Sequence, residues 1–146
     1  MGMTKYLFVY GTLMSHAKGQ LGTDQRQRLA SESYLLGQAR ITGQLFDLGD
    51  YPALALEKDS ALFVYGEVLD LHDPIATFAW LDTYEGIDPT KLAENEYRRV
   101  VHSVELKNSG PTEAWVYALN VRVNEQQLIE SGRWLATVRD TTWKDL

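Results

Sequence analysis

The chain opens on an uninterrupted apolar run, residues 6–10, that leads directly into Gly11. A run of this length, rich in aromatic and β-branched residues, predicts a buried strand. Gly11 then predicts a turn at a place where a Cβ would clash. Beyond the strand, the amides of Gly11, Thr12 and Leu13 can point together into a cavity and form an anion-binding nest. A strand followed by an ordinary glycine turn explains the same residues.

Alternating and short apolar segments predict further strands along the chain. They cover residues 31–48, 53–57, 62–71, 96–107 and 112–119, with turns at 49–52, 58–60 and 108–111. Gly66 falls inside one of these strands, which is typical of a bulge or of a close approach by another backbone. The turn at 108–111 joins the last two strands, so we expect them to form a hairpin.

Two shorter segments carry helix signals of their own. Thr23 or Asp24 is the expected N-cap of a short helix that follows a polar loop and ends near Leu29. Asn124 is expected to cap a helix over residues 124–134. Residues 135–146 are expected to form a tail.

A third helix carries the most informative carboxylate. Asp73 as N-cap and Pro74 in the first turn predict a helix over residues 74–85. Phe78 and Glu85 are seven residues apart, which returns them to nearly the same helix face. A glutamate directed at an apolar interior is unfavourable unless it is paired or neutralised. Burial would raise its pKa towards neutrality, as a general base requires.

Other interpretations of this helix end remain open. Glu85 faces the core if Ile75 and Phe78 do so as well. Glu85 could instead lie in a fraying last turn and point to water, or pair with Arg98 or Arg99. Asp82 falls off the apolar face and is expected to be a solvated or capping carboxylate.

The number and order of the predicted strands and helices indicate the fold class. About six or seven strands and two or three helices, without regular βα alternation, indicate an α+β domain on a mostly antiparallel sheet or barrel. A chain of 146 residues is typical of one domain with a real core. Neither G-x-G-x-x-G after a strand nor G-K-[ST] occurs, so the standard nucleotide-binding loops are absent from the sequence.

Charge argues against a nucleic-acid partner. Twenty acidic and fourteen basic side chains give a net charge of −6, whereas nucleic-acid binders usually show a basic face or stripe. The two basic concentrations, Arg26 with Arg28 and Arg98 with Arg99, are simply explained as solvated helix or strand faces. We therefore expect no nucleic-acid partner.

The remaining composition narrows the chemistry. No apolar run is long enough to span a bilayer, and the N-terminus shows no secretory signal, so we expect no membrane partner and a cytoplasmic location. The sequence has no cysteine, which excludes disulfides and a thiol nucleophile. Its three histidines, His16, His72 and His102, are widely spaced, and no metal site is expected.

Six short motifs occur in a fixed order. They are YGTL at residues 10–13, GQLFDLGDYPAL at 43–54, VYGEV at 64–68, LDTYEG at 81–86, EYRRV at 96–100 and AWVY at 114–117. Each is weak alone, but their order and spacing resemble the gamma-glutamylcyclotransferase-like family, which includes gamma-glutamylamine cyclotransferases and many bacterial members. We expect a single domain over residues 1–146, with a core at about 4–120 and a C-terminal helix and tail at 121–146.

The resemblance implies both a fold and a site. The fold would be a small mixed, mostly antiparallel β-barrel with flanking helices and a pocket at one side. The loop Tyr10-Gly11-Thr12-Leu13 would hold the α-amino-acid end of the substrate, largely through backbone groups. Glu85 would be the general acid/base, and active family members release 5-oxoproline from a γ-glutamyl compound.

This reaction suits the residues that are present. The substrate's own α-amine attacks its own γ-carbonyl, so neither an enzyme nucleophile nor a cofactor is needed. Tyr51, Tyr97 and Tyr117 are candidate pocket walls whose hydroxyls would orient the substrate, with core or surface positions as the alternative. Residues 14–19 depart from the commoner bacterial pattern in a region that shapes the pocket, so the resemblance does not specify the substrate.

Two classes of function follow from the resemblance. The first is a cyclotransferase acting on a small γ-glutamyl compound, working as a monomer or weak homodimer. The second is a non-catalytic module that binds a small molecule in the same pocket. Glu85 favours the enzyme, because binding an amino acid does not by itself need a buried base. An interaction protein that uses its acidic surface is a weaker, third alternative.

Overall fold

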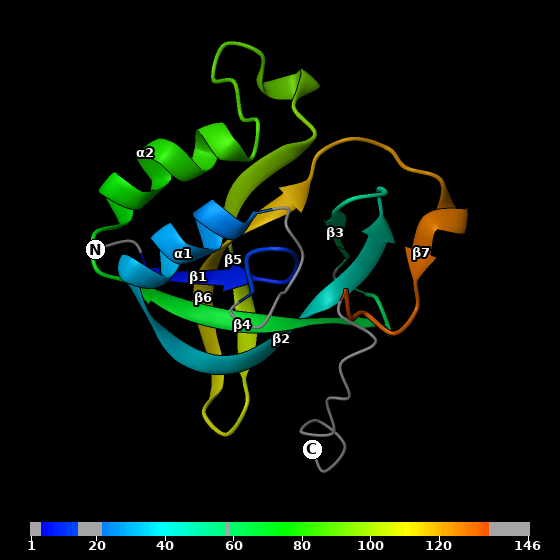
Figure 1. Ribbon diagram of the computed structural model, residues 1–146. Coiled ribbons are helices and arrows are strands. Elements are labelled where there is room, and N and C mark those ends of the chain that lie inside the picture. Colours follow the sequence, from blue (N-terminus) through cyan, green and yellow to red (C-terminus); the bar gives the residue numbers. More distant parts are fainter. Residues whose placement is uncertain (1–3, 15–21, 58, 135–146) are drawn as a thin grey trace.

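The computed structural model describes residues 4–14, 22–57 and 59–134, and Figure 1 shows their arrangement. The strands are β1 Tyr6–Val9, β2 Ser33–Asp47, β3 Pro52–Leu56, β4 Phe63–Leu71, β5 Tyr97–Leu106, β6 Gly110–Leu119 and β7 Leu128–Ile129. The helices are α1 Thr23–Ser31 and α2 Pro74–Tyr84, with short 3₁₀ turns at Leu92–Glu94 and Glu125–Gln127.

Five strands close into a mixed barrel. The ring runs β1–β4–β2–β3–β6 and returns to β1. Its β1–β4, β4–β2 and β2–β3 pairings are antiparallel, and its β3–β6 and β6–β1 pairings are parallel. Strand β5 pairs antiparallel with β6 and β2, and β7 adds to β2. The expected small, mostly antiparallel α+β barrel is confirmed.

A glycine allows two barrel strands to approach closely. A Cβ on Gly66 of β4 would lie 2.1 Å from the carbonyl oxygen of Val9 in β1 and 3.0 Å from the ring of Phe8. No side chain fits there, because the nearest atom belongs to backbone. The close approach expected at Gly66 is therefore present.

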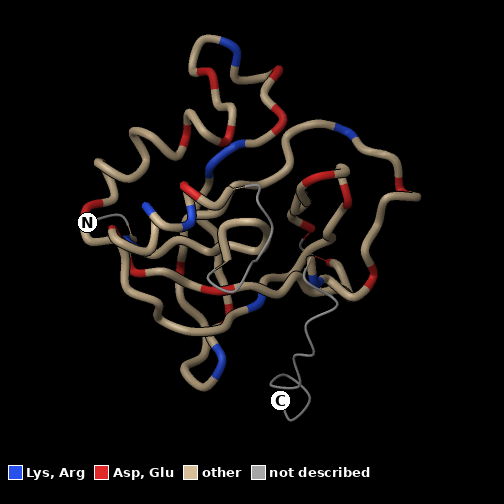
Figure 2. Tube along the Cα trace, viewed as in Figure 1, with Lys and Arg blue, Asp and Glu red and all other residues tan. Residues whose placement is uncertain are grey.

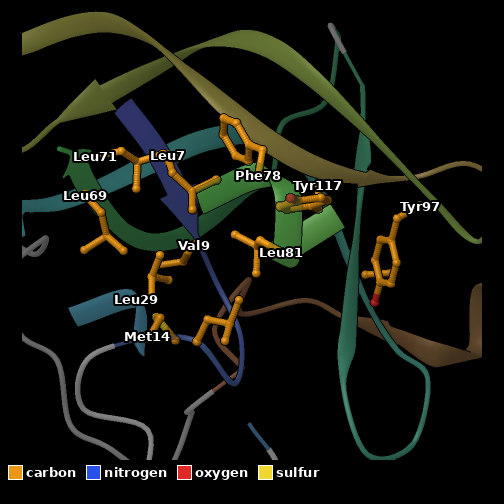
Figure 3. Packing of buried hydrophobic residues seen from close by; sticks show 12 residues of the cluster. Leu7, Val9, Met14, Leu29, Leu69, Leu71, Phe78, Leu81, Tyr97 and Tyr117 are labelled. Atoms are coloured by element: carbon orange, nitrogen blue, oxygen red, sulfur yellow. The ribbon is translucent and has the colours of Figure 1, made fainter. Parts of the chain in front are cut away.

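Both helices lie over the same side of the barrel. Leu29 of α1 and Phe78 and Leu81 of α2 pack with Leu7 and Val9 of β1 in one buried cluster (Figure 3). This packing fixes the rotation of α2 about its axis. The end of α2 therefore has a defined orientation relative to β1.

One helix position differs from the prediction. Ile75 is 86% exposed and does not face the core. The buried stripe consists of Thr77, Phe78 and Leu81. Viewed along the helix axis, Ile75 lies about 60° from Phe78, on the side opposite to Thr77 and Leu81. The seven-residue relation between Phe78 and Glu85 holds without it.

Two predictions about helices were wrong: the N-cap residue of the first helix, and the helix expected over residues 124–134. Helix α1 begins at Thr23 behind Gly22, which is the N-cap and adopts φ 80°, so neither Thr23 nor Asp24 caps it. Residues 124–134 do not form a helix. Asn124 is an N-cap, as expected, and forms a capping box with Gln127, but it caps only a 3₁₀ turn. The chain then becomes β7 because Leu128 and Ile129 pair with β2.

The predicted tail and most of the atypical 14–19 segment lie outside the described residues. Lys and Arg residues are spread over several elements of the described chain (Figure 2). None of the helices within the described ranges is long and apolar enough to cross a membrane.

Candidate active site

A cavity of about 370 Å³ lies where β1 ends. The loop that follows β1, the C-terminal end of α2 and the residues around the starts of β3 and β5 line it. All of the substrate-binding candidates and the candidate base belong to its lining: Tyr10, Gly11, Thr12, Leu13, Tyr51, Tyr97, Tyr117 and Glu85. Residues spread over more than a hundred positions thus meet around one space.

The loop after β1 is held from both sides. The amide of Met14 donates to the carbonyl of Gly11 at 3.1 Å, which closes a turn. From α1, the Arg26 guanidinium donates to the carbonyl of Thr12 at 2.8 Å. No hydrogen bond within the described residues occupies the amides of Gly11, Thr12 and Leu13. These amides are available to a ligand.

Gly11 lies in a turn where a Cβ would clash, as the sequence predicts, although its backbone angles do not require glycine. Its φ is not positive, so its turn does not need a residue without a Cβ. A Cβ would instead lie 2.7 Å from Cγ and 2.9 Å from Cδ of Pro52, at the start of β3. The glycine therefore lets the loop pack directly on the Pro52 ring.

Glu85 forms the C-cap of α2. Its amide donates to the carbonyl of Leu81 at 2.9 Å, so the helix does not fray before it. Gly86 follows with φ 78° and ends the helix. The Glu85 carboxylate makes no hydrogen bond or ion pair with any described residue. Because no buried side-chain oxygen is left without a partner, its oxygens reach the open cavity.

The environment of Glu85 favours its neutral form. Burial, followed by the negative charges of Asp82 and Glu96, raises its pKa from 4.5 to about 7. A carboxyl with this pKa is populated in both protonation states near neutral pH, so it can accept a proton and return it.

Asp82 is neither a capping nor a freely solvated residue, contrary to the prediction. It accepts two hydrogen bonds from the Arg99 guanidinium, at 2.8 and 3.1 Å. It also accepts one from the hydroxyl of Tyr117, at 2.6 Å. Arg99 therefore pairs with Asp82 and not with Glu85, and Arg98 is exposed. The ion-pair alternative for Glu85 was wrong.

The hydroxyls of two tyrosines in the cavity wall already have hydrogen-bond partners within the protein. Tyr10 donates to the carbonyl of Tyr117 at 2.5 Å and accepts the amide of Leu54 at 3.2 Å. Tyr97 donates to the carbonyl of Pro52 at 2.7 Å. Burial raises the pKa of both hydroxyls. These side chains offer ring faces to a ligand, and their protons are already donated within the protein.

Tyr51 has a different partner. Its hydroxyl donates to Oε1 of Glu96 at 2.7 Å, and this bond, together with burial, raises its pKa to about 12. Its ring lies 6.2 Å from that of Tyr97. Glu96 itself lines the cavity.

Glu96 and Tyr84 are cavity residues that sequence reasoning missed as site candidates. Glu96 directly precedes Tyr97, and Tyr84 directly precedes Glu85, both of which were predicted site residues. The available signal was membership of the EYRRV and LDTYEG motifs. Among the described residues, no group of three or more histidines and carboxylates is arranged to hold a metal ion.

Known structures share this barrel. A YkqA structure from Bacillus subtilis is 28% identical and superposes with a TM-score of 0.64 over 90% of this chain. The match covers 40% of YkqA, so this chain spans less than half of that protein. An AIG2-like protein from Mus musculus matches with a TM-score of 0.67 at 18% identity, over 90% of this chain and 88% of its own.

An uncharacterised protein from Pyrococcus horikoshii matches with a TM-score of 0.59 at 19% identity, over 92% of both chains. A search of curated protein sequences gives no significant match. The family model described as "Gamma-glutamyl cyclotransferase, AIG2-like" matches residues 7–136, and this span includes every residue that lines the cavity. The chain therefore belongs to the AIG2-like gamma-glutamyl cyclotransferase family.

Proposed function

We propose that this chain is a gamma-glutamyl cyclotransferase that releases 5-oxoproline from a γ-glutamyl amine or amino-acid conjugate. Glu85 is its general acid/base. The observation that carries the proposal is a carboxylate with a pKa of about 7 in the same cavity as three loop amides, none of which has a hydrogen-bond partner among the described residues. Family membership supports a cyclotransferase, and the substrate and the role of Glu85 are our proposal.

The reaction moves two protons from the attacking nitrogen of the substrate to its leaving nitrogen, because an α-ammonium becomes a lactam N–H. An α-ammonium titrates at about pH 8 and is mostly charged at neutral pH. Glu85 takes its proton, and the free amine attacks the γ-carbonyl carbon. A new C–N bond closes the lactam ring, and Glu85 gives its proton to the leaving nitrogen as the bond to that nitrogen breaks. Glu85 then takes the second proton from the ring nitrogen, which leaves a neutral lactam N–H, and releases it to the amine, which departs as an ammonium ion. Proton transfer of this kind contributes about 10²- to 10⁴-fold.

Binding supplies the rest of the rate enhancement. The amides of Gly11, Thr12 and Leu13 suit the α-carboxylate or the oxyanion that forms at the γ-carbonyl. The rings of Tyr51, Tyr97 and Tyr117 would hold the chain of the substrate folded, so that its amine meets its own carbonyl. We also propose a cytoplasmic enzyme that works as a monomer or weak homodimer, which cell fractionation and size-exclusion chromatography would test.

The proposal is tested with a panel of γ-glutamyl amines and γ-glutamyl amino acids, followed by measurement of 5-oxoproline. We expect the wild type to convert at least one of them, and Glu85→Gln to lose at least about 100-fold in kcat while still binding the substrate. Glu94→Gln changes an exposed carboxylate and should retain full activity. A wild type that binds these compounds without product would instead be a binding module, and full activity of Glu85→Gln would remove that residue from the mechanism.

A further inference from the structure

Among the described residues, the cavity is lined by carboxylates without a basic side chain beside them. Its lining includes the carboxylates of Glu85 and Glu96, and none of the described lining residues is Arg, Lys or His. Two arginines that are bound beside the cavity have protein partners: Arg99 pairs with Asp82, and Arg26 donates to the carbonyl of Thr12. A positively charged group on a ligand would be stabilised by these carboxylates in this cavity.

Glu96 has one oxygen fixed and one free. Oε1 accepts the 2.7 Å hydrogen bond from Tyr51, which orients the carboxylate. Oε2 has no hydrogen-bond partner among the residues that the structure describes. The side chain is partly buried and no buried oxygen lacks a partner, so Oε2 is accessible, and Glu96 is one of the residues that line the cavity.

A short series of contacts places Glu96 at the same end of the cavity as the β1 loop. Gly11 packs on the ring of Pro52. The hydroxyl of Tyr97, the neighbour of Glu96, donates to the carbonyl of Pro52. Tyr51, which binds Glu96, directly precedes Pro52. The carboxylate of Glu96 and the β1 loop thus line the same part of one cavity.

We propose that Glu96, oriented by Tyr51, binds the α-ammonium group of the substrate and presents it to Glu85. This inference rests on the proposed function and adds a specificity residue to it. The carboxylate at the loop and the ammonium at Glu96 together fix the α-carbon. When Glu85 takes one proton, the remaining N–H groups still donate to Glu96, and the nitrogen lone pair is left for the γ-carbonyl.

The test compares two ligands that differ in this charge. γ-Glutamyl methylamide carries an α-ammonium, whereas the lactam nitrogen of 5-oxoproline is neutral. Affinities are measured by calorimetry at about pH 6.5, where the ammonium is charged, in a Glu85→Gln background that prevents turnover. Adding Glu96→Gln should weaken binding of the methylamide by about 10- to 100-fold. Its effect on 5-oxoproline should stay within about threefold, because the lactam forms no ion pair with Glu96.

Two controls isolate the charge. Adding Glu94→Gln, an exposed carboxylate of the preceding 3₁₀ turn, should change neither affinity. A ligand-side control needs no change at Glu96. The methylamide without its α-amine should bind Glu85→Gln about 10- to 100-fold more weakly than the complete compound. Equal effects of Glu96→Gln on both ligands, or no effect on either, would overturn the inference.

Failure of this inference is distinguishable from failure of the proposed function. A wild type that converts γ-glutamyl methylamide, with Glu96→Gln unchanged in KM, overturns the role of Glu96 alone. A wild type that neither binds nor converts any γ-glutamyl compound overturns the proposed function and this inference with it.

Discussion

The hydroxyl of Tyr117 donates a 2.6 Å hydrogen bond to Asp82, three residues before Glu85. This bond joins barrel strand β6 to the last turn of α2. Arg99 of β5 holds the same carboxylate through two further hydrogen bonds, and its guanidinium lies 3.9 Å above the ring of Phe78. The helix end that carries Glu85 is thus fixed to two strands.

Replacing Tyr117 by Phe removes this hydrogen bond and keeps the ring. Because the acceptor is a charged and partly buried carboxylate, we expect the free energy of unfolding to fall by about 1–3 kcal/mol. Urea denaturation measures the change. Tyr34→Phe, at a side chain that is 66% exposed, is the matched control and should stay within about 0.5 kcal/mol of the wild type. Equal stability of the two variants would show that the bond to Asp82 contributes little.

Asp82→Asn tests the electrostatics around the base. The negative charge of Asp82 raises the pKa of Glu85, and its removal also leaves the positive charge of Arg99 uncompensated. Both effects favour ionised Glu85, so the rising limb of kcat/KM against pH should move to lower pH than in the wild type. Glu113→Gln removes an exposed charge from β6 and should leave the limb in place. A shift to higher pH would contradict this arrangement.

Gly11→Ala tests the contact between the loop and Pro52. The new Cβ would lie 2.7 Å from Cγ of the proline, so the loop or the ring must move. We expect a loss of about 1–3 kcal/mol in the free energy of unfolding and weaker binding of 5-oxoproline. Pro52→Ala removes the obstructing ring atoms, so the double variant should bind better than Gly11→Ala alone. If the losses of the two single variants simply add up in the double variant, the contact between the new Cβ and Pro52 does not cause the loss in Gly11→Ala.

Glu85→Gln should alter the pH dependence of stability. The folded-state pKa of about 7 lies above the ordinary value of 4.5, so the folded protein binds this proton more tightly than the unfolded chain does. The resulting stability is present below about pH 4.5 and is lost as the pH rises through about 7. At about pH 8, Glu85→Gln should therefore exceed the wild type by about 1–3 kcal/mol in the free energy of unfolding, less than the full shift because Glu85 is partly exposed. Parallel stability curves from about pH 4 to 8 would contradict the raised pKa.

The sequence was sufficient wherever the determining pattern was local. The spacing of Phe78 and Glu85 was enough to place the carboxylate on the core side of α2, even though Ile75 was assigned to the wrong face. The apolar run into Gly11 correctly predicted a strand that ends at the cavity. Both features depend on helix or strand periodicity, which acts over a few residues.

Contacts between distant residues explain what was missed. Tyr51 and Glu96 are 45 residues apart, and Tyr117 and Asp82 are 35 apart, so no local pattern links them. The expected helix over 124–134 was replaced because Leu128 and Ile129 gain strand pairing with Phe46 and Leu45. Tertiary pairing of this kind overrides helix propensity, which is a weak local preference.

The most direct test of the account is the pH profile of kcat/KM for 5-oxoproline release by the wild type. If Glu85 is the base, the rising limb should have its midpoint at about pH 7, where its raised pKa lies. A rising limb near pH 4.5, the ordinary value for a glutamate, or a rate that does not depend on pH between the two values, would contradict it.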